Sequence, residues 1–207
     1  TKAPDVAEAH RNYLDIQSAI DYYVFQYEIC GLDGLAKNML LATYDLKVWH
    51  CGAYDMDSTF GLWIDGSKFV SASYACPEDY QEQFSLLWER FEANFLPELK
   101  ARQAALRKNV LSYSNMVTHF ERFMDVIGLD LYAEDLTIYN IPSGATNNIK
   151  RIRNYIRDRQ SYVVSEFAAM IEPVRCTGIT LSANALTFTA EGTQTLTAAV
   201  TPDGCTD

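Results

Sequence analysis

The sequence predicts an α+β fold: a mostly helical body that contains one β-hairpin, followed by the opening strands of a β-sandwich. Three observations support this prediction. Apolar residues recur every three or four positions through most of the chain up to position 172, two apolar runs flank a turn after position 38, and Thr alternates with apolar residues after position 177. With 207 residues, 48% of them hydrophobic, the chain is long and apolar enough to bury a core.

A helix and a hairpin are expected first. Asp15 is a suitable N-cap for a helix whose apolar residues recur from Ile16 onward until Gly31 ends it. The runs M-L-L-A-T-Y and K-V-W-H-C-G-A-Y then flank the turn-like pair Asp45-Leu46, so they predict a β-hairpin. The segment Y-D-M-D stands at the far end of its second strand.

From Pro77 onward the pattern is helical. One apolar stripe precedes Pro97 and another follows it, because proline is expected to interrupt the helix. A third helix is expected to open at Ser114. The stripe before the proline has helical spacing, which is typical of core rather than of a sugar-binding platform, and consists of Phe84, Leu87, Trp88, Phe91 and Phe95.

A long helix is expected over residues 146–172, with apolar residues as far as Ile171 facing inward. Its first half carries a basic face. Such a face is usually solvated, and here it consists of Lys150, Arg151, Arg153, Arg157 and Arg159.

The pattern changes again at Pro173. Segments such as G-I-T-L-S and T-Q-T-L-T-A-A-V-T-P alternate Thr with apolar residues, as strands of a sandwich do. They resemble the start of a bacterial group 2 immunoglobulin-like domain. We therefore expect a helical domain over residues 1–173 and the N-terminal strands of an immunoglobulin-like domain over residues 178–207.

Charge and composition limit the partners. A net charge of −10 argues against a nucleic-acid partner, because a phosphate backbone requires a basic surface. No run of eighteen apolar residues occurs, so no membrane span is expected, and the opening T-K-A-P-D-V-A-E lacks the apolar core of a signal peptide. The cysteines form no C-x-x-C pair and are expected mostly as buried free thiols: Cys30, Cys51, Cys76, Cys176 and Cys205.

Two acidic segments are candidates for metal chemistry. Asp33 and Asn38 have the D-x-x-x-x-N spacing of a protein-kinase catalytic loop, in which the Asp accepts the proton of the substrate hydroxyl and the Asn binds magnesium. Asp55 and Asp57 stand in an aromatic segment, where a carboxylate is costly unless it meets a cation or several donors. Magnesium prefers such oxygens, so we expect side-chain oxygens of Asn38 and of Asp55 or Asp57 within about 5 Å of each other.

Three segments between positions 13 and 61 carry a family resemblance: L-D-I-Q-S-A-I-D-Y-Y-V-F-Q-Y-E-I, D-G-L-A-K-N-M-L-L and Y-D-M-D-S-T-F-G. Together they resemble the C-terminal part of the spore-coat CotH family of atypical protein kinases, and the later Y-I-R-D-R matches that family more loosely. The resemblance implies ATP- and Mg²⁺-dependent phosphorylation of Ser or Thr in a protein substrate. The roles it implies are catalytic base for Asp33 and metal ligands for Asn38, Asp55 and Asp57.

The sequence also departs from the kinase pattern. Gly31 and Leu32 stand where kinases have His-Arg, and Asp57-Ser-Thr-Phe-Gly replaces Asp-Phe-Gly. The chain has no room before Asp15 for the small lobe that carries a phosphate-binding loop and a nucleotide-anchoring Lys. Lys150, Arg151 and Arg153 would supply some of the missing positive charge only if their helix turned toward the cleft. We therefore expect this chain alone to bind ATP weakly at best and to transfer no phosphate, whatever the activity of a longer parent.

A second hypothesis treats the four candidate residues as turn and cap residues of an inert kinase-like scaffold. The chain is then a structural or adhesion module of a phage virion or a bacterial surface protein, and its partner is a neighbouring structural protein. The immunoglobulin-like tail favours an extracellular, cell-surface or virion location under either hypothesis. A nucleophile–base pair at His50 and Cys51 is disfavoured, because adjacent strand residues point to opposite faces.

Overall fold

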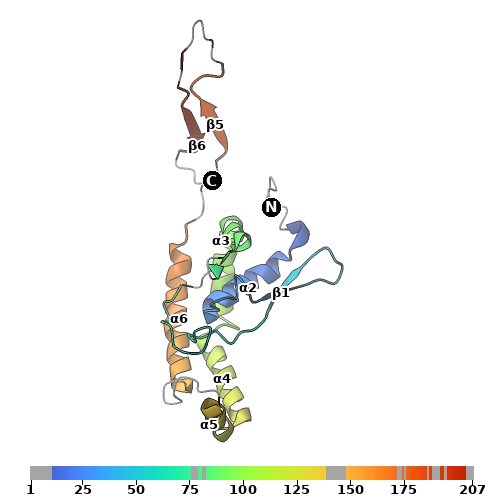
Figure 1. The fold of residues 1–207 in the computed structure, drawn as a ribbon, viewed down its shortest axis with the longest axis vertical. Coiled ribbons are helices and arrows are strands. Elements are labelled where there is room, and N and C mark those ends of the chain that lie inside the picture. Colours follow the sequence, from blue (N-terminus) through green and yellow to red (C-terminus); the bar gives the residue numbers. More distant parts are fainter. Residues whose placement is uncertain are drawn as a thin grey trace. The chain divides into compact units, whose positions relative to one another are not determined.

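A computed structural model describes residues 11–75, 79–80, 83–138, 148–171, 174, 176–185, 187, 192–193 and 195–203. Contacts divide the chain into two compact units, Thr1–Met170 and Ile171–Asp207. The predicted α+β class is confirmed, with helices and small antiparallel sheets along the chain (Figure 1). Within the part of the chain that was described, no helix is both long and apolar enough to cross a membrane.

The first unit contains five described helices and two small hairpins. The helices are α2 (Ile16–Ile29), α3 (Leu86–Arg107), α4 (Tyr113–Ile127), α5 (Leu129–Ile138) and α6 (Ile149–Ala169). The hairpins pair β1 (Met39–Ala42) with β2 (His50–Ala53) and β3 (Asp79–Tyr80) with β4 (Gln83–Phe84).

Helix α2 begins where the sequence predicts. The Asp15 carboxylate accepts a hydrogen bond from the Ser18 N–H at 2.7 Å, which satisfies one of the free donors of the first turn. The helix ends at Cys30, which adopts the left-handed conformation with φ of 54° and donates its N–H back to the last turn. The residue that ends the helix is therefore a cysteine one position before the expected Gly31.

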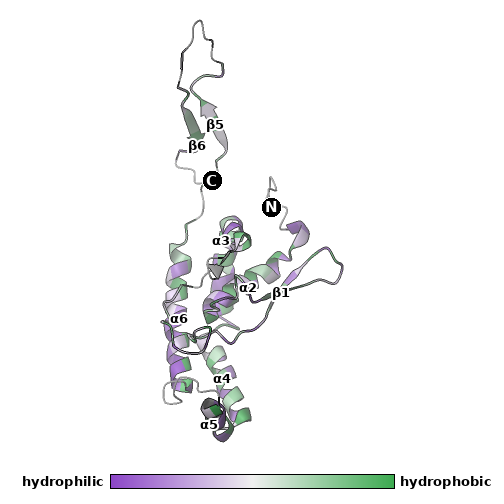
Figure 2. Cartoon of the chain, in the orientation of Figure 1, coloured by the Kyte–Doolittle hydropathy of each residue, from purple (hydrophilic) through white to green (hydrophobic). Residues whose placement is uncertain are grey.

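The core of the first unit lies between α2 and the helices α3 and α6, both of which pack against it. Trp88, Phe91 and Tyr23 are fully buried, and the rings of Tyr23 and Trp88 lie 5.7 Å apart. Their burial confirms the core assignment of the predicted stripe. Figure 2 shows both hydrophobic and hydrophilic segments on each of these helices, as expected for helices that cover a core.

The two apolar stripes on either side of Pro97 lie on two parts of α3, which is kinked at Phe95 (φ −129°, ψ 19°). Several other boundaries differ from the prediction. Phe84 belongs to β4 and not to the helix. Ile171 is 87% exposed and lies beyond the end of α6. Helix α5 was not expected at all.

The basic face of α6 is also not uniformly solvated. Arg159 is fully buried, and its guanidinium donates to main-chain oxygens that include that of Tyr27, at 2.7 Å. Arg151 is half-buried, whereas Arg153 and Arg157 are exposed as predicted. The helical periodicity identified the element, but the two partly or fully buried cations contradict the solvated interpretation.

The second unit contains a hairpin of β5 (Gly178–Leu181) and β6 (Ala198–Thr201), paired so that Gly178 faces Thr201. Both strands are exposed along their length. The assignment to an immunoglobulin-like domain stays a prediction.

The cysteine prediction is partly wrong. Cys30 and Cys51 are free thiols, but Cys176 is disulfide-bonded. The other two, Cys76 and Cys205, lie outside the described residues, as does His10.

Candidate functional site

The loop between α2 and β1 places Asn38 next to Asp33. The Asp33 carbonyl oxygen accepts from the N–H groups of Lys37 at 2.8 Å and Asn38 at 3.0 Å, so the chain makes one tight turn. This turn returns the Asn38 side chain to the Asp33 carboxylate, and Asn38 Nδ2 donates to Asp33 Oδ2 at 2.9 Å. Both residues are buried, with 3% of Asp33 and 5% of Asn38 exposed.

The β1–β2 hairpin then brings the acidic segment back to the same place. Because Met39 pairs with Ala53, the residues just outside the hairpin ends are neighbours. Asn38 Nδ2 donates a second hydrogen bond, at 3.3 Å, to the main-chain oxygen of Asp55. Asp55 has φ of 54°, a conformation that is uncommon for a residue with a side chain. The carboxylate-bearing residues Asp55 and Asp57 are exposed.

Ser58 provides a second connection between the two segments. Its hydroxyl donates to Asp33 Oδ1 at 3.2 Å, and its main-chain oxygen accepts from the Leu32 N–H at 3.3 Å. Both carboxylate oxygens of Asp33 therefore accept a hydrogen bond, which fixes the orientation of the group. Ser58 was missed by the sequence reasoning because a serine after an acidic turn has no distinctive spacing. Its position directly after Asp57 is the only available signal.

Helix α2 supports the loop that contains Asp33 and Asn38. The Tyr22 hydroxyl oxygen lies 2.6 Å from the Gly34 carbonyl oxygen and 2.9 Å from that of Asn38, so its proton is shared between them or donated to one. Gln26 is fully buried and its Oε1 lies 2.0 Å from where a Cβ on Gly34 would sit. A side chain at position 34 would therefore force Gln26 to shift.

Gln26 also contacts the acidic segment. Its Nε2 lies 3.5 Å from Sδ of Met56, the residue between the two exposed aspartates. One side chain of α2 therefore touches both the Asp33 loop and the acidic turn.

The donor set fits magnesium in its chemistry. Asn38 uses Nδ2 for both hydrogen bonds, which leaves its Oδ1 as a possible ligand, and Asp55 and Asp57 offer exposed hard oxygens. Over the described ranges, no group of three or more His, Cys, Asp or Glu side chains is placed to hold a metal ion. Magnesium is usually bound by one or two carboxylates and completed by water and phosphate, so a cage of protein ligands is not required. The expected distance between side-chain oxygens of Asn38 and the two aspartates stays a prediction.

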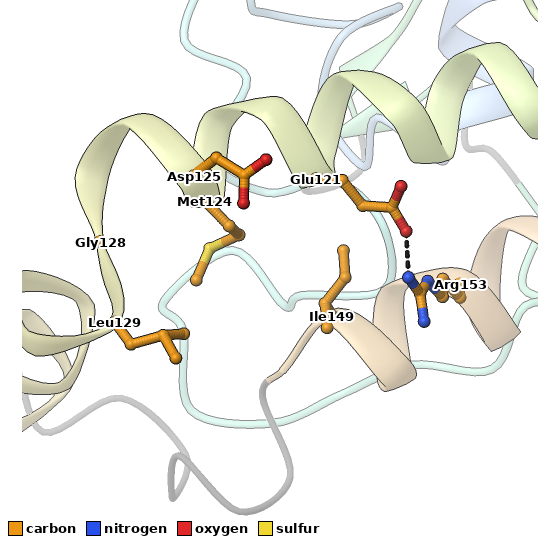
Figure 3. Close-up of a pocket in the computed structure, with 7 residues that line it drawn as sticks. All are labelled: Glu121, Met124, Asp125, Gly128, Leu129, Ile149 and Arg153. Carbon is orange, nitrogen blue, oxygen red and sulfur yellow. Dashed lines mark hydrogen bonds and ion pairs between the residues drawn. The ribbon is translucent and has the colours of Figure 1, made fainter.

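A pocket of about 390 Å³ lies away from these residues, between α4 and the start of α6 (Figure 3). Glu121 and Arg153 form an ion pair on one side of it. None of the four predicted site residues contributes to its lining, which consists of Glu121, Met124, Asp125, Gly128, Leu129, Ile149 and Arg153.

Comparison with known proteins identifies a family. The family described as CotH kinase protein matches residues 2–163, a range that contains all four predicted site residues and most of α6. No curated protein and no solved structure matches the chain significantly.

Proposed function

The chain belongs to the CotH kinase family, and we propose that its first unit contributes the catalytic base and the metal ligands of a kinase-like domain that, in the full-length protein, uses Mg²⁺ and ATP to phosphorylate Ser or Thr of a protein substrate. One observation supports this most directly: a single side chain, Asn38, bonds both to the carboxylate of Asp33 and to the main chain of Asp55. A general base and a metal-binding segment must lie together in a phosphoryl-transfer site.

In this proposal Asp33 accepts the proton of the attacking hydroxyl. Its two oxygens already accept from Ser58 and Asn38, but each carboxylate oxygen has a further lone pair. Because only 3% of Asp33 is exposed, the substrate hydroxyl reaches it only when the covering side chains move apart. The two existing hydrogen bonds keep the carboxylate oriented during that approach.

Asn38 Oδ1 and the carboxylates of Asp55 and Asp57 would hold the magnesium ion. Bound there, the ion would supply positive charge against the phosphates of the nucleotide. Asn38 thereby ties the position of the metal ligands to that of the base, since its other atom donates to Asp33.

A second candidate function follows from the burial of Asp33. The Asp33 carboxylate is shielded from solvent and accepts a hydrogen bond at both oxygens. A purely structural turn residue has the same properties. The alternative is a non-catalytic structural or adhesion module of a virion or bacterial surface. The disulfide at Cys176 supports an extracellular or surface location under either proposal, because disulfides persist in oxidising compartments.

The two proposals are separated by titrating the 207-residue chain with Mn²⁺ and with Mg²⁺–ATP in a calorimeter. The kinase-like proposal expects saturable Mn²⁺ binding that is weakened at least tenfold, or about 1.4 kcal/mol, by Asp57→Asn, and at most weak Mg²⁺–ATP binding by this chain alone. The matched control is Asp65→Asn, another exposed turn aspartate whose carboxylate accepts from the Ser67 N–H. Equal Mn²⁺ binding by wild type and Asp57→Asn would contradict the assigned metal site, and no Mn²⁺ binding by either would favour the structural module.

A further inference from the structure

The turn that follows the acidic segment has an unusual backbone. Phe60 has φ of 50° and Gly61 has φ of 80°, so two consecutive residues adopt conformations with positive φ. For Phe60 this conformation is strained, and such strain persists only where surrounding contacts enforce it. The question is which contacts hold Phe60 in place.

Three contacts converge on Phe60 from different parts of the chain. Its N–H donates to the Ile29 carbonyl oxygen at 2.7 Å, its ring packs edge-on against Phe120 at 4.9 Å, and its own carbonyl oxygen accepts from Arg151 Nη1 at 2.7 Å. The last of these contacts comes from α6, 91 positions further along the chain. It is also the only one of the three made by a charged group.

Arg151 is itself held firmly. Its guanidinium carbon lies 4.4 Å from the centroid of the Phe69 ring, and its main-chain N–H donates to the Asn148 cap at 3.1 Å. Burial lowers the pKa of Arg151, but a guanidinium stays protonated in proteins. A cation that has lost part of its water shell bonds a carbonyl oxygen more strongly than an exposed one does.

The next turn of α6 also contacts the segment at Phe60 and Gly61. Tyr155 is four residues from Arg151 and therefore lies on the same helix face. A Cβ on Gly61 would lie 2.4 Å from the Tyr155 ring, so the chain passes directly against that ring. One face of α6 thus contacts both residues of the strained turn.

We propose that Arg151 is a positioning residue that fixes the acidic segment from its C-terminal end. Asn38 holds the segment at Asp55, and Arg151 holds it at Phe60, with Asp57 and Ser58 between the two attachments. These contacts alone support the claim that Arg151 positions the turn. The effect of this positioning on metal binding rests on the proposed function. The sequence reasoning treated Arg151 as part of a solvated face.

The test compares Arg151→Gln and Arg151→Lys with the control Arg157→Gln in the 207-residue chain. Arg157 lies on the same helix, has a side chain that is 61% exposed, and forms an ion pair with its neighbour Asp158. Amide hydrogen exchange is measured without metal at Phe60 and Leu32, whose N–H groups bond across the turn, and at Val24 in the buried middle of α2. Mn²⁺ affinity is measured separately by calorimetry.

We expect Arg151→Gln to speed exchange at Phe60 and Leu32 about tenfold while Val24 is unchanged, because only the turn loses its attachment. Mn²⁺ affinity should fall about tenfold, as for other residues that orient metal ligands. Arg151→Lys should retain part of the protection from exchange and part of the Mn²⁺ affinity that Arg151→Gln loses. Arg157→Gln should change neither the exchange rates nor the Mn²⁺ affinity.

Unchanged exchange at Phe60 in Arg151→Gln overturns the proposal. Equal acceleration at all three amides also overturns it, because Arg151 then stabilises the whole body. If the wild type binds Mn²⁺ and Arg151→Gln binds it equally well, the positioning role is overturned as well. If the wild type binds no Mn²⁺, the proposed function fails, and the exchange data alone decide whether Arg151 positions the turn.

Discussion

Asn38 Nδ2 donates to the Asp33 carboxylate at 2.9 Å and to the Asp55 carbonyl oxygen at 3.3 Å, so one amide group joins two segments that are 22 positions apart in the sequence. Replacing it by Asn38→Ala leaves the buried Asp33 without one of its two donors. A hydrogen bond to a charged group contributes about 1.5–3 kcal/mol, so we expect a loss of this size in the free energy of unfolding.

Urea denaturation of Asn38→Ala measures that loss. The control is Asn109→Ala, at an exposed asparagine beyond the end of α3, which is expected to change stability by less than about 0.5 kcal/mol. Equal stability of the two variants would show that the amide of Asn38 does not hold the segments together.

Gly34→Ala tests the close approach of Gln26 beneath the Asp33 loop. The added Cβ would lie 2.0 Å from Gln26 Oε1 and 2.4 Å from its Cδ, so the fully buried Gln26 has to shift. Overpacking of this kind costs about 1–3 kcal/mol, and thermal unfolding should report it.

Gly52→Ala is the matched control for that substitution. A Cβ on Gly52 meets its nearest neighbour at 3.8 Å, an ordinary contact distance. If the thermal unfolding midpoint of Gly34→Ala is equal to or above that of Gly52→Ala, Gln26 accommodates the added methyl group without a cost in stability.

The sequence predicted the local features of the site because each depends on nearby residues. The Asp15 cap and the β1–β2 hairpin follow from capping chemistry and from apolar runs around a turn, and both occur where expected. The order of Asp33, Asn38 and the acidic segment then brings them together through the hairpin register. Their roles in catalysis and metal binding stay predictions.

Contacts between distant segments were not predictable in the same way. The sequence indicates exposed side chains for Arg151 and Arg159, because a charged residue is buried only when specific partners compensate its charge. Those partners lie far away in the sequence. Periodicity places both residues on a helix and gives no information on those distant partners.

The buried carboxyl of Glu28 predicts a pH-dependent contribution to stability. Burial raises its pKa above the ordinary 4.5, although the Gln103 hydrogen bond at 3.0 Å and the charges of Arg107 and Arg159 oppose the rise. Its Oε2 has no hydrogen-bond partner in the described part of the chain. Because the folded state holds the proton more tightly than the unfolded state, this contribution is complete below about pH 4.5 and is lost as the pH rises through the folded pKa.

Glu28→Gln removes that titration and keeps the side-chain shape. The unfolding free energy of wild type minus that of Glu28→Gln should therefore fall between pH 4.5 and neutrality, when both are measured by urea denaturation across the range. Asp21→Asn, which alters a partly exposed carboxylate paired with Arg102, is the control and should not reproduce this fall. A constant difference across the range would contradict the assignment to Glu28.

Cys51 should react slowly with alkylating agents in the folded protein. Burial, and secondarily the negative charge of Asp15, raise the pKa of its thiol from 9.0 to about 12. The thiolate is the reactive form, so at pH 8 a rise of that size lowers its population about 1000-fold relative to an unperturbed thiol.

Mass spectrometry of the peptide that contains Cys51 after iodoacetamide treatment measures the labelling rate, with urea-unfolded protein as the reference. Asp15→Asn, which still caps α2, should accelerate labelling modestly because it removes the smaller cause and leaves burial in place. Labelling of native Cys51 at the unfolded rate would contradict a half-buried, protonated thiol at this position.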